Sequence, residues 1–194
     1  NLHYINAFTV PAGAYTLRAA IRSSEDRRLG VREQTVLTAP SVRDAIALSE
    51  LLVTNRIQAT EEREAAGPDV SVTLGDGRFV PHPSRRFLSS DSLFIYFQIY
   101  LPEGRELKDT DLSIGIQFIR DGSVSNRLET RKITEPQSSL PGLINFATVV
   151  PLAEFTPGEY IIQVQAIDHT ARKFAFRRAS FFVVESPTGA GSSR

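Results

Sequence analysis

The 194-residue sequence contains no cysteine, no methionine and no tryptophan, and its formal net charge is zero. Without cysteine, disulfide bonds, thiolate catalysis and cysteine-based metal sites are excluded. Because Lys plus Arg and Asp plus Glu both number 22, the chain has no overall electrostatic attraction for nucleic acid or an anionic membrane. Because methionine is missing, we expect the chain not to be a complete translation product, with Asn1 following processing, proteolysis or truncation.

Long apolar runs are also missing, and helical periodicity is scarce. No run approaches the roughly 20 residues of a membrane-spanning helix, and no signal-peptide pattern is present. What recurs is alternation of apolar and polar residues, rich in Val, Ile, Phe, Tyr and Thr and interrupted by Pro and Gly turns. This pattern predicts an all-β protein of Ig-like or fibronectin-III-like β-sandwich modules. The alternating runs lie near residues 15–22, 31–37, 93–100, 114–118, 162–166 and 174–184.

One segment leaves two interpretations open. Residues 41–52 have a candidate helix cap in Ser41 or Asp44, but their apolar residues fit an extended strand as well. We favour the extended form. Tight turns are predicted at Asp76-Gly77 and Asp121-Gly122.

The most informative feature is an internal repeat. The stretch VPAGAYTLRAAIRSSEDRRLGVREQTVLT, from Val10, aligns without a gap with FTPGEYIIQVQAIDHTARKFAFRRASFFVV, from Phe155. Each copy indicates a turn, a strand, a polar loop and a second strand, as in the closing hairpin of an Ig-like sandwich. In such domains a tyrosine near the start of the penultimate strand bonds its hydroxyl to backbone across a corner. The alternative is that two unrelated hairpins resemble each other in composition. The matched pairs are Gly13 with Gly158, Tyr15 with Tyr160, Leu17 with Ile162, Arg27 with Arg172, Val31 with Phe176 and Leu37 with Phe182.

The repeat predicts the domain organisation. Residues 1–56 are too few for a complete sandwich, which usually needs about 100, so we expect them to be the closing strands of a first module that begins outside this chain. Residues 57–69 are polar and acidic and indicate a linker. Residues 70–186 have the length of one complete sandwich, and residues 187–194 form a flexible tail.

The hairpin sequences PAGAYTLRAAIR and TPGEYIIQVQAID are similar to hairpins that close Ig-like repeats in many exported bacterial proteins. The stretches ALSELLVT and LGDGRFVPHPSRRFLSSDSLFIYFQIY resemble the C-terminal Ig-like β-sandwich region of bacterial proteins with a von Willebrand factor A-related domain. They are also similar to the sandwich part of bacterial proteins named for a Gly-Trp-x-Thr-Asp motif. The resemblance runs from about Thr9 to Val184 and implies a secreted, periplasmic or cell-envelope location. Both the Gly-Trp-x-Thr-Asp motif and the Asp-x-Ser-x-Ser adhesion motif are absent, so no functional residue is carried over.

Residues able to perform chemistry are scattered. No histidine has a second ligand at zinc spacing, and no phosphate-binding loop or Gly-x-Ser-x-Gly motif occurs. Asp109-Thr110-Asp111 is a weak calcium candidate beside the commoner turn and cap roles. We therefore predict no catalytic, metal-binding or cofactor-binding residue, and no enzyme. The histidines are His3, His82 and His169, and the loop carboxylates are Asp76, Asp91, Asp109, Asp111 and Asp121.

One aromatic cluster is a candidate binding surface. Phe94, Tyr96 and Tyr100 lie on one face of an alternating strand, where they either stack on a ligand or partner, or pack as core against a neighbouring module or loop. The sequence as a whole predicts a structural or protein-interaction module of a larger exported bacterial protein. Its partner would be another protein or a neighbouring domain of the same polypeptide. The alternative is a carbohydrate-binding or accessory domain of a secreted enzyme.

Overall fold

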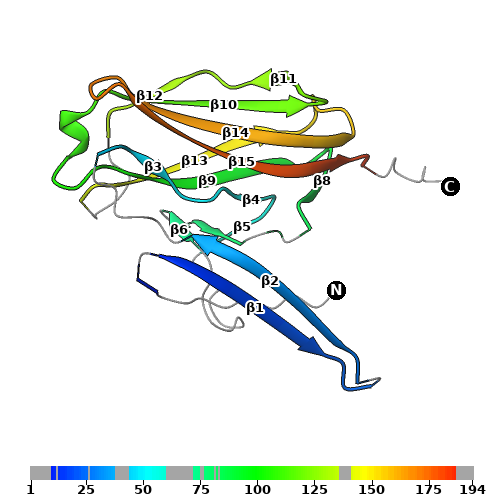
Figure 1. The fold of residues 1–194 in the computed structure, drawn as a ribbon. Helices are drawn as coiled ribbons and strands as arrows, with labels where there is room; N and C mark the ends of the chain where they lie inside the picture. Colours follow the sequence, from blue (N-terminus) through cyan, green and yellow to red (C-terminus); the bar gives the residue numbers. More distant parts are fainter. Residues whose placement is uncertain are drawn as a thin grey trace.

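The computed structural model describes residues 10–11, 13–25, 27–37, 44–59, 72–74, 77–80, 82, 84–135 and 141–186. In these residues the regular structure is β-strand, apart from one 3₁₀ turn, η1 (Leu107–Asp109) (Figure 1). The all-β prediction is confirmed. The described part of the ambiguous segment, from residue 44 onward, is extended. No helix in the described residues is long and apolar enough to cross a membrane.

The largest sheet has the strand order β11-β10-β14-β15-β8, and β12 also pairs with β10. Its pairs are antiparallel except that between β15 and β8, which run parallel. Beyond this pair, Ser186 bonds the chain just after β8: its Oγ accepts from the Ser90 N–H at 2.9 Å, and its own N–H donates to Ser89 Oγ at 3.2 Å. The strands are β8 (Arg86–Leu88), β10 (Leu112–Arg120), β11 (Ser123–Arg127), β12 (Arg131–Ile133), β14 (Gly158–Asp168) and β15 (Lys173–Val184).

The second sheet has the order β13-β9-β3, with β4 also on β9. It contains β3 (Ala47–Leu48), β4 (Leu52–Thr54), β9 (Ser92–Tyr100) and β13 (Leu143–Pro151). This pairing corrects the predicted domain boundary at residue 56. Residues 47–54 were assigned to a first module, but they hydrogen-bond to β9 because their alternate apolar residues, such as Leu48 and Val53, are buried in the same core.

A small third sheet has the order β5-β7-β6 and comprises β5 (Ile57–Ala59), β6 (Val72–Leu74) and β7 (Gly77–Phe79). Residues 57–59 of the predicted linker therefore belong to a strand, while residues 60–69 and the predicted tail at 187–194 lie outside the described residues. The ring of Phe79 packs on β9, with its centroid 6.4 Å from that of Phe94 and 5.6 Å from that of Tyr96.

One hydrophobic core joins the two larger sheets. Every second residue of β9, from Leu93 to Ile99, and every second residue of β10, from Leu112 to Phe118, belongs to the same buried cluster. Successive strand side chains point to opposite faces, so the alternation read from the sequence places these residues inward. The turn at Asp121-Gly122 links β10 to β11 with positive φ at both residues (49° and 78°), as the predicted tight turn requires.

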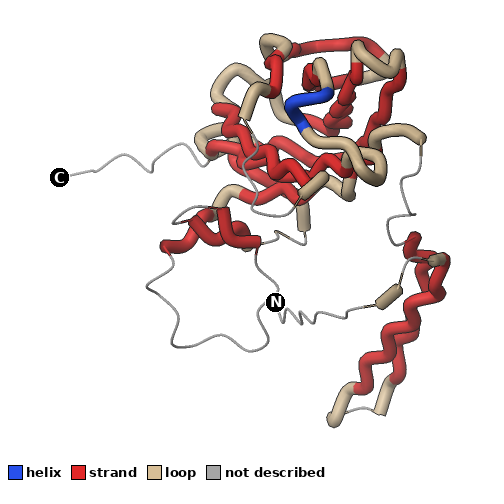
Figure 2. The backbone as a smooth tube through the Cα atoms, turned by 90° about the vertical axis from the view of Figure 1, so that its left-hand side faces the viewer, coloured by secondary structure: helices blue, strands red, loops and turns tan. Residues whose placement is uncertain are grey.

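The first two strands form a separate hairpin. β1 (Ala14–Arg22) and β2 (Leu29–Leu37) pair antiparallel as a two-stranded sheet. In Figure 2 the hairpin stands apart from the larger sheets. All nine residues of β1 and the described side chains of β2 are exposed. A two-stranded hairpin is only marginally stable by itself in water. Contacts with other elements or proteins would therefore increase its stability.

Candidate functional site

The exposed hairpin β1–β2 has the same strand register as the hairpin β14–β15, which is buried on one face. Tyr15 lies opposite Val36, and the repeat-matched Tyr160 lies opposite Phe181. The loops also match, because Arg27 and Arg172 both adopt left-handed backbone, with φ of 57° and 53°. Similar composition alone would not fix the same register and the same loop conformation.

The tyrosine at the start of each hairpin makes the predicted backbone bond. The Tyr15 hydroxyl donates to the carbonyl oxygen of Pro11 at 3.0 Å, and the Tyr160 hydroxyl donates to that of Thr156 at 2.9 Å. Pro11 and Thr156 occupy matched positions of the repeat. The two hairpins are therefore copies of one supersecondary unit.

The matched glycines differ in what a side chain would meet. At Gly13 a Cβ atom would lie 3.4 Å from Cε2 of Tyr15, whose ring folds back over the turn. Gly158 has a φ of +150°, a conformation that side chains rarely adopt, and a Cβ there would lie 3.1 Å from Nη2 of Arg120. A side chain would therefore be strained at Gly158, whereas at Gly13 it would only touch the Tyr15 ring.

The environments of the two hairpins differ completely. Tyr160 is 2% exposed and its ring stacks on Phe181 at 5.5 Å, whereas Tyr15 is 37% exposed. We call Tyr15, Leu17, Ala19, Ile21 and Val36 the apolar hairpin face; by register they lie on one side of the hairpin. Their counterparts in the second hairpin are buried: Tyr160, Ile162, Val164, Ala166 and Phe181.

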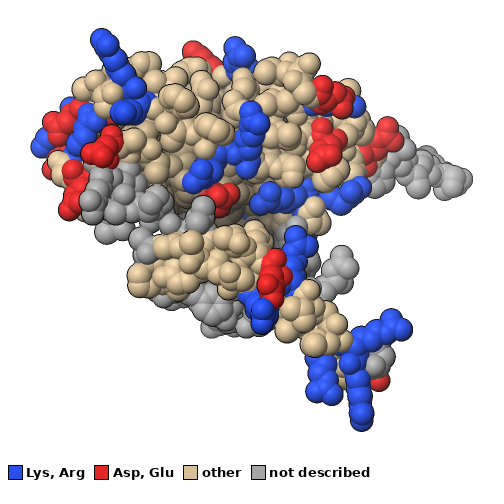
Figure 3. Space-filling view, viewed as in Figure 1, with Lys and Arg blue, Asp and Glu red and all other residues tan. Residues whose placement is uncertain are grey.

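Charge is kept off most of the apolar hairpin face. The ion pair between Arg18 and Glu33, 2.5 Å between Nε and Oε1, lies on the opposite side. Positive side chains gather at the far end of the hairpin in Figure 3, where the loop residues Arg27 and Arg28 lie. On the apolar side, Arg32 beside Ala19 is the exception. The result is an uncovered apolar strip with a basic tip.

Substitution of the two tyrosines separates the two environments. Tyr160→Phe should lower the free energy of unfolding by about 1–2 kcal/mol, because it removes a buried hydroxyl that bonds to Thr156. Tyr15→Phe should leave the global transition unchanged, since that bond is solvent-exposed. Urea denaturation followed by circular dichroism measures both. Equal losses in the two variants would contradict the difference in burial.

The aromatic cluster on β9 is partly covered in the structure. Tyr96 is buried under Phe79, and its hydroxyl donates to Asn145 Oδ1 at 2.8 Å. Phe94 and Tyr100 are half-buried, and the Tyr100 hydroxyl donates to Gln98 Oε1 at 2.8 Å. Burial raises the pKa of both tyrosine hydroxyl groups. At Tyr96, interaction with the Gln98 side chain lowers the pKa in part, and the nearby Tyr100 raises it by a smaller amount. Tyr96 therefore offers no ring face for stacking on a ligand.

The remaining sequence candidates have local partners. The ring of His169 hydrogen-bonds through Nε2 to Ser113 Oγ at 2.8 Å, and His82 through Nδ1 to Ser84 Oγ at 3.1 Å. Asp111 pairs with Lys132 at 2.8 Å, and this hydrogen bond lowers the pKa of its carboxyl group. In the part of the chain that the structure describes, no group of three or more His, Asp or Glu could hold a metal ion. His3 and Asp76 lie outside the described residues.

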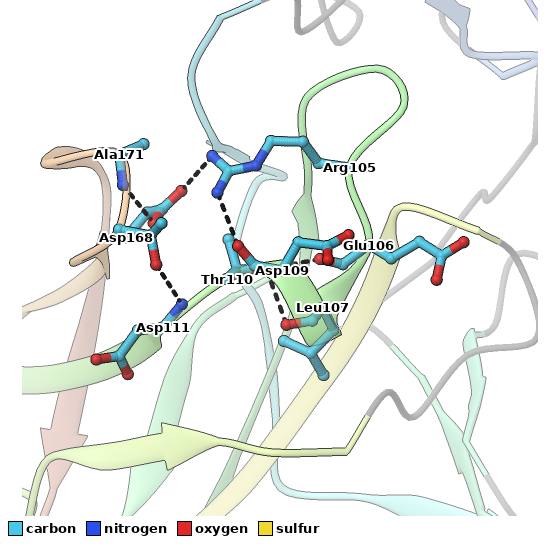
Figure 4. Close-up of polar contacts among 9 residues, drawn as sticks. Arg105, Glu106, Leu107, Asp109, Thr110, Asp111, Asp168 and Ala171 are labelled. Atoms are coloured by element: carbon cyan, nitrogen blue, oxygen red, sulfur yellow. Dashed lines mark hydrogen bonds and ion pairs between the residues drawn. The ribbon is translucent and has the colours of Figure 1, made fainter.

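A buried ion pair that the sequence did not reveal joins the loop before η1 to the last residue of β14 at one end of the sheets (Figure 4). Asp168 accepts from Arg105 Nη1 at 2.9 Å through Oδ2 and from the Ala171 N–H at 2.9 Å through Oδ1. Arg105 also donates from Nη2 to the carbonyl oxygen of Asp109 at 3.1 Å. Since both carboxylate oxygens accept hydrogen bonds, this arrangement holds the loop that contains Arg105 to the end of β14.

Comparison with known proteins adds no relative. No protein-family model matches the chain, and no curated protein matches it. What the chain does must therefore be inferred from its own geometry. Within that geometry, the apolar hairpin face is the strongest candidate for a functional surface.

Proposed function

We propose that the chain is a non-catalytic structural or protein-interaction module of a larger exported bacterial protein, built on an Ig-like β-sandwich. One observation carries this proposal: the apolar hairpin face is exposed, while its counterpart in β14–β15 is core. Apolar strips of this kind on a sheet are places of contact with other proteins or domains. The bacterial and exported context rests on the resemblance of the two hairpin sequences.

The strand order supports the Ig-like arrangement. One sheet holds β3 and β4 beside β9 and β13, and the other runs from β8 through β15, β14 and β10 to β11. An Ig-like sandwich also has two sheets, with a tyrosine corner at the start of the penultimate strand, so this grouping and the Tyr160 hydrogen bond support the proposal. By the repeat, β1–β2 is the closing hairpin of another such module.

A second surface favours the carbohydrate-binding alternative. Phe174 and Phe176 are 69% and 53% exposed and lie on the same face of β15, with the Arg178 guanidinium 5.9 Å from the Phe176 ring centroid. Exposed aromatic rings beside polar side chains can stack on sugars. The two candidate surfaces lie on different hairpins and can be tested separately.

Leu17→Asp in the full chain should reduce binding of the hydrophobic dye bis-ANS several-fold, because the charge interrupts the apolar hairpin face. Arg18→Asp is the matched control on the opposite face and should leave dye binding near the original value. Fluorescence titration of both variants and the original protein measures the effect. The proposed function also expects no saturable binding to a glycan array.

Two results would contradict this function. Equal dye binding by the Leu17→Asp variant and the original protein would show that the apolar hairpin face is not an accessible surface. Saturable glycan binding that is lost in Phe174→Ala would favour the carbohydrate alternative. Circular dichroism of each variant checks that the larger sheets remain folded.

A further inference from the structure

We propose that the β1–β2 hairpin binds an incomplete β-sandwich that lacks its own last two strands, and that an edge strand of this partner adds antiparallel to β1. The inference rests on the proposed function and names the partner of the apolar hairpin face. The copy of the unit within the same chain shows what such a hairpin packs against. The partner is thus defined by its strand pattern and its missing hairpin.

The free edge of β1 corresponds to the edge of β14 that is paired with β10. In that pair Phe118 lies opposite Ile162, Ile116 opposite Val164 and Ile114 opposite Ala166. In the repeat, Leu17, Ala19 and Ile21 occupy the positions of these three β14 residues. We therefore expect successive apolar residues of the partner strand to lie opposite them. In the described residues β1 pairs with β2 alone, so its other edge is available for main-chain hydrogen bonds.

The partner must cover the apolar face of the hairpin in addition to pairing with its free edge. Leu17 and Ile21 are 48% and 72% exposed. Their counterparts Ile162 and Ala166 lie in the core that β14 shares with β9 and β10. A single added strand would pair with the edge but would leave the apolar side in water. The partner must therefore bring a second apolar sheet over the hairpin.

Residue size indicates that this partner differs from the sandwich already present in the chain. Val164 and Ala166 correspond to Ala19 and Ile21, so the large and small side chains exchange positions. Close packing would require a bulkier contact over Ala19 and a smaller one over Ile21 than β14 receives. The hairpin is complementary to a related core with its own side-chain pattern.

A second copy of the chain does not meet these requirements. Its β10 is already paired on both sides, with β14 and with β11 and β12, so it has no equivalent edge to offer. Two nine-residue hairpins packed face to face would bury only a few hundred Å² each by strand dimensions, below the ~800 Å² per partner of standard stable interfaces. An incomplete sandwich supplies both the edge and the cover.

Disulfide trapping tests the predicted register, because the chain has no cysteine of its own. The probe is a synthetic peptide with the sequence of residues 110–121, carrying Ile116→Cys; it copies β10 and tests the predicted edge pairing separately from the cover by a second sheet. The full chain carries Ala19→Cys, the position predicted to lie opposite. Register controls are Leu17→Cys, displaced by two residues along the same face, and Ala20→Cys, which points to the other face. We expect the rate of disulfide trapping to be at least several-fold higher at Ala19→Cys than at either control position. In urea the three rates should become equal.

Two outcomes would overturn the inference. Equal trapping at all three positions under native conditions would mean that no β10-type strand binds in the predicted register. Rapid disulfide dimerisation of the Ala19→Cys chain alone, at a rate unaffected by peptide, would assign the face to a second copy. Either result leaves the dye-binding experiment unaffected. If Leu17→Asp still lowers dye binding, the interaction function stands and only the partner proposed here is rejected.

Discussion

Phe181→Ala is expected to lower the free energy of unfolding of the full chain by about 3–5 kcal/mol, the usual loss for a buried phenylalanine. Phe181 is fully buried on β15, and its ring contacts those of four other aromatic residues. The substitution removes these contacts and leaves a cavity that the surrounding β-strands cannot close. Urea denaturation monitored by circular dichroism gives the change as a shift of the midpoint. The four rings belong to Phe87, Phe118, Phe155 and Tyr160.

The repeat supplies a matched control for this substitution. Val36 occupies the position of Phe181 in the exposed hairpin and lies opposite Tyr15 as Phe181 lies opposite Tyr160. Val36→Ala should change the global free energy of unfolding by less than about 0.5 kcal/mol, as is usual for surface substitutions. A loss from Val36→Ala as large as that from Phe181→Ala would mean that the first hairpin is covered in the isolated chain.

Arg105→Met should destabilise the full chain by about 3 kcal/mol, the lower end of the range for breaking a buried ion pair by removing one partner. The Asp168 side chain is 1% exposed, so its charge would remain in the interior without Arg105. The Arg105 side chain is 26% exposed, which lets water approach and keeps the loss from being larger. Because the loss comes from an uncompensated charge, the Arg105→Met, Asp168→Leu double variant should recover part of the stability.

A neighbouring pair provides the control for this experiment. Lys108 and Glu106 are 2.8 Å apart in the same loop region, but both side chains are largely exposed. Lys108→Met should give no measurable change in the urea midpoint, since exposed ion pairs contribute little. If the double variant at Arg105 and Asp168 were less stable than Arg105→Met alone, the buried charge would not be the cause of the loss.

Local patterns predicted most of the strands because alternation depends on nearby residues. The run from Leu93 to Tyr100 predicted a strand, and β9 has the core on one face and Phe79 against the other. The tyrosine corner was also predictable, because donor and acceptor are four residues apart. The turn at Asp121-Gly122 depends on two adjacent residues whose types favour positive φ.

Contacts between distant residues were not predictable in this way. Arg105 and Asp168 are 63 residues apart, and neither belongs to a motif that would mark them as a pair. The pairing of residues 47–54 with β9 was missed because a short apolar segment carries no signal for the sheet that it joins. Most important for function, the alternation in β1 is the same as that in β14, so sequence predicted the hairpin but not its exposure.

The parallel contact between β8 and β15 has a mechanical consequence. Arg86 to Leu88 runs alongside Phe182 to Val184 in the same direction. Tension that pulls the start of β8 away from the end of β15 therefore acts along the strands in opposite senses. The hydrogen bonds between these strands are then sheared together instead of opening one after another, as they would in a hairpin pulled from its two ends. Bonds loaded together break at a higher force than bonds loaded one at a time, so the three-residue pair of β8 and β15 resists this direction of pulling better than an antiparallel pair of the same length pulled from its two ends.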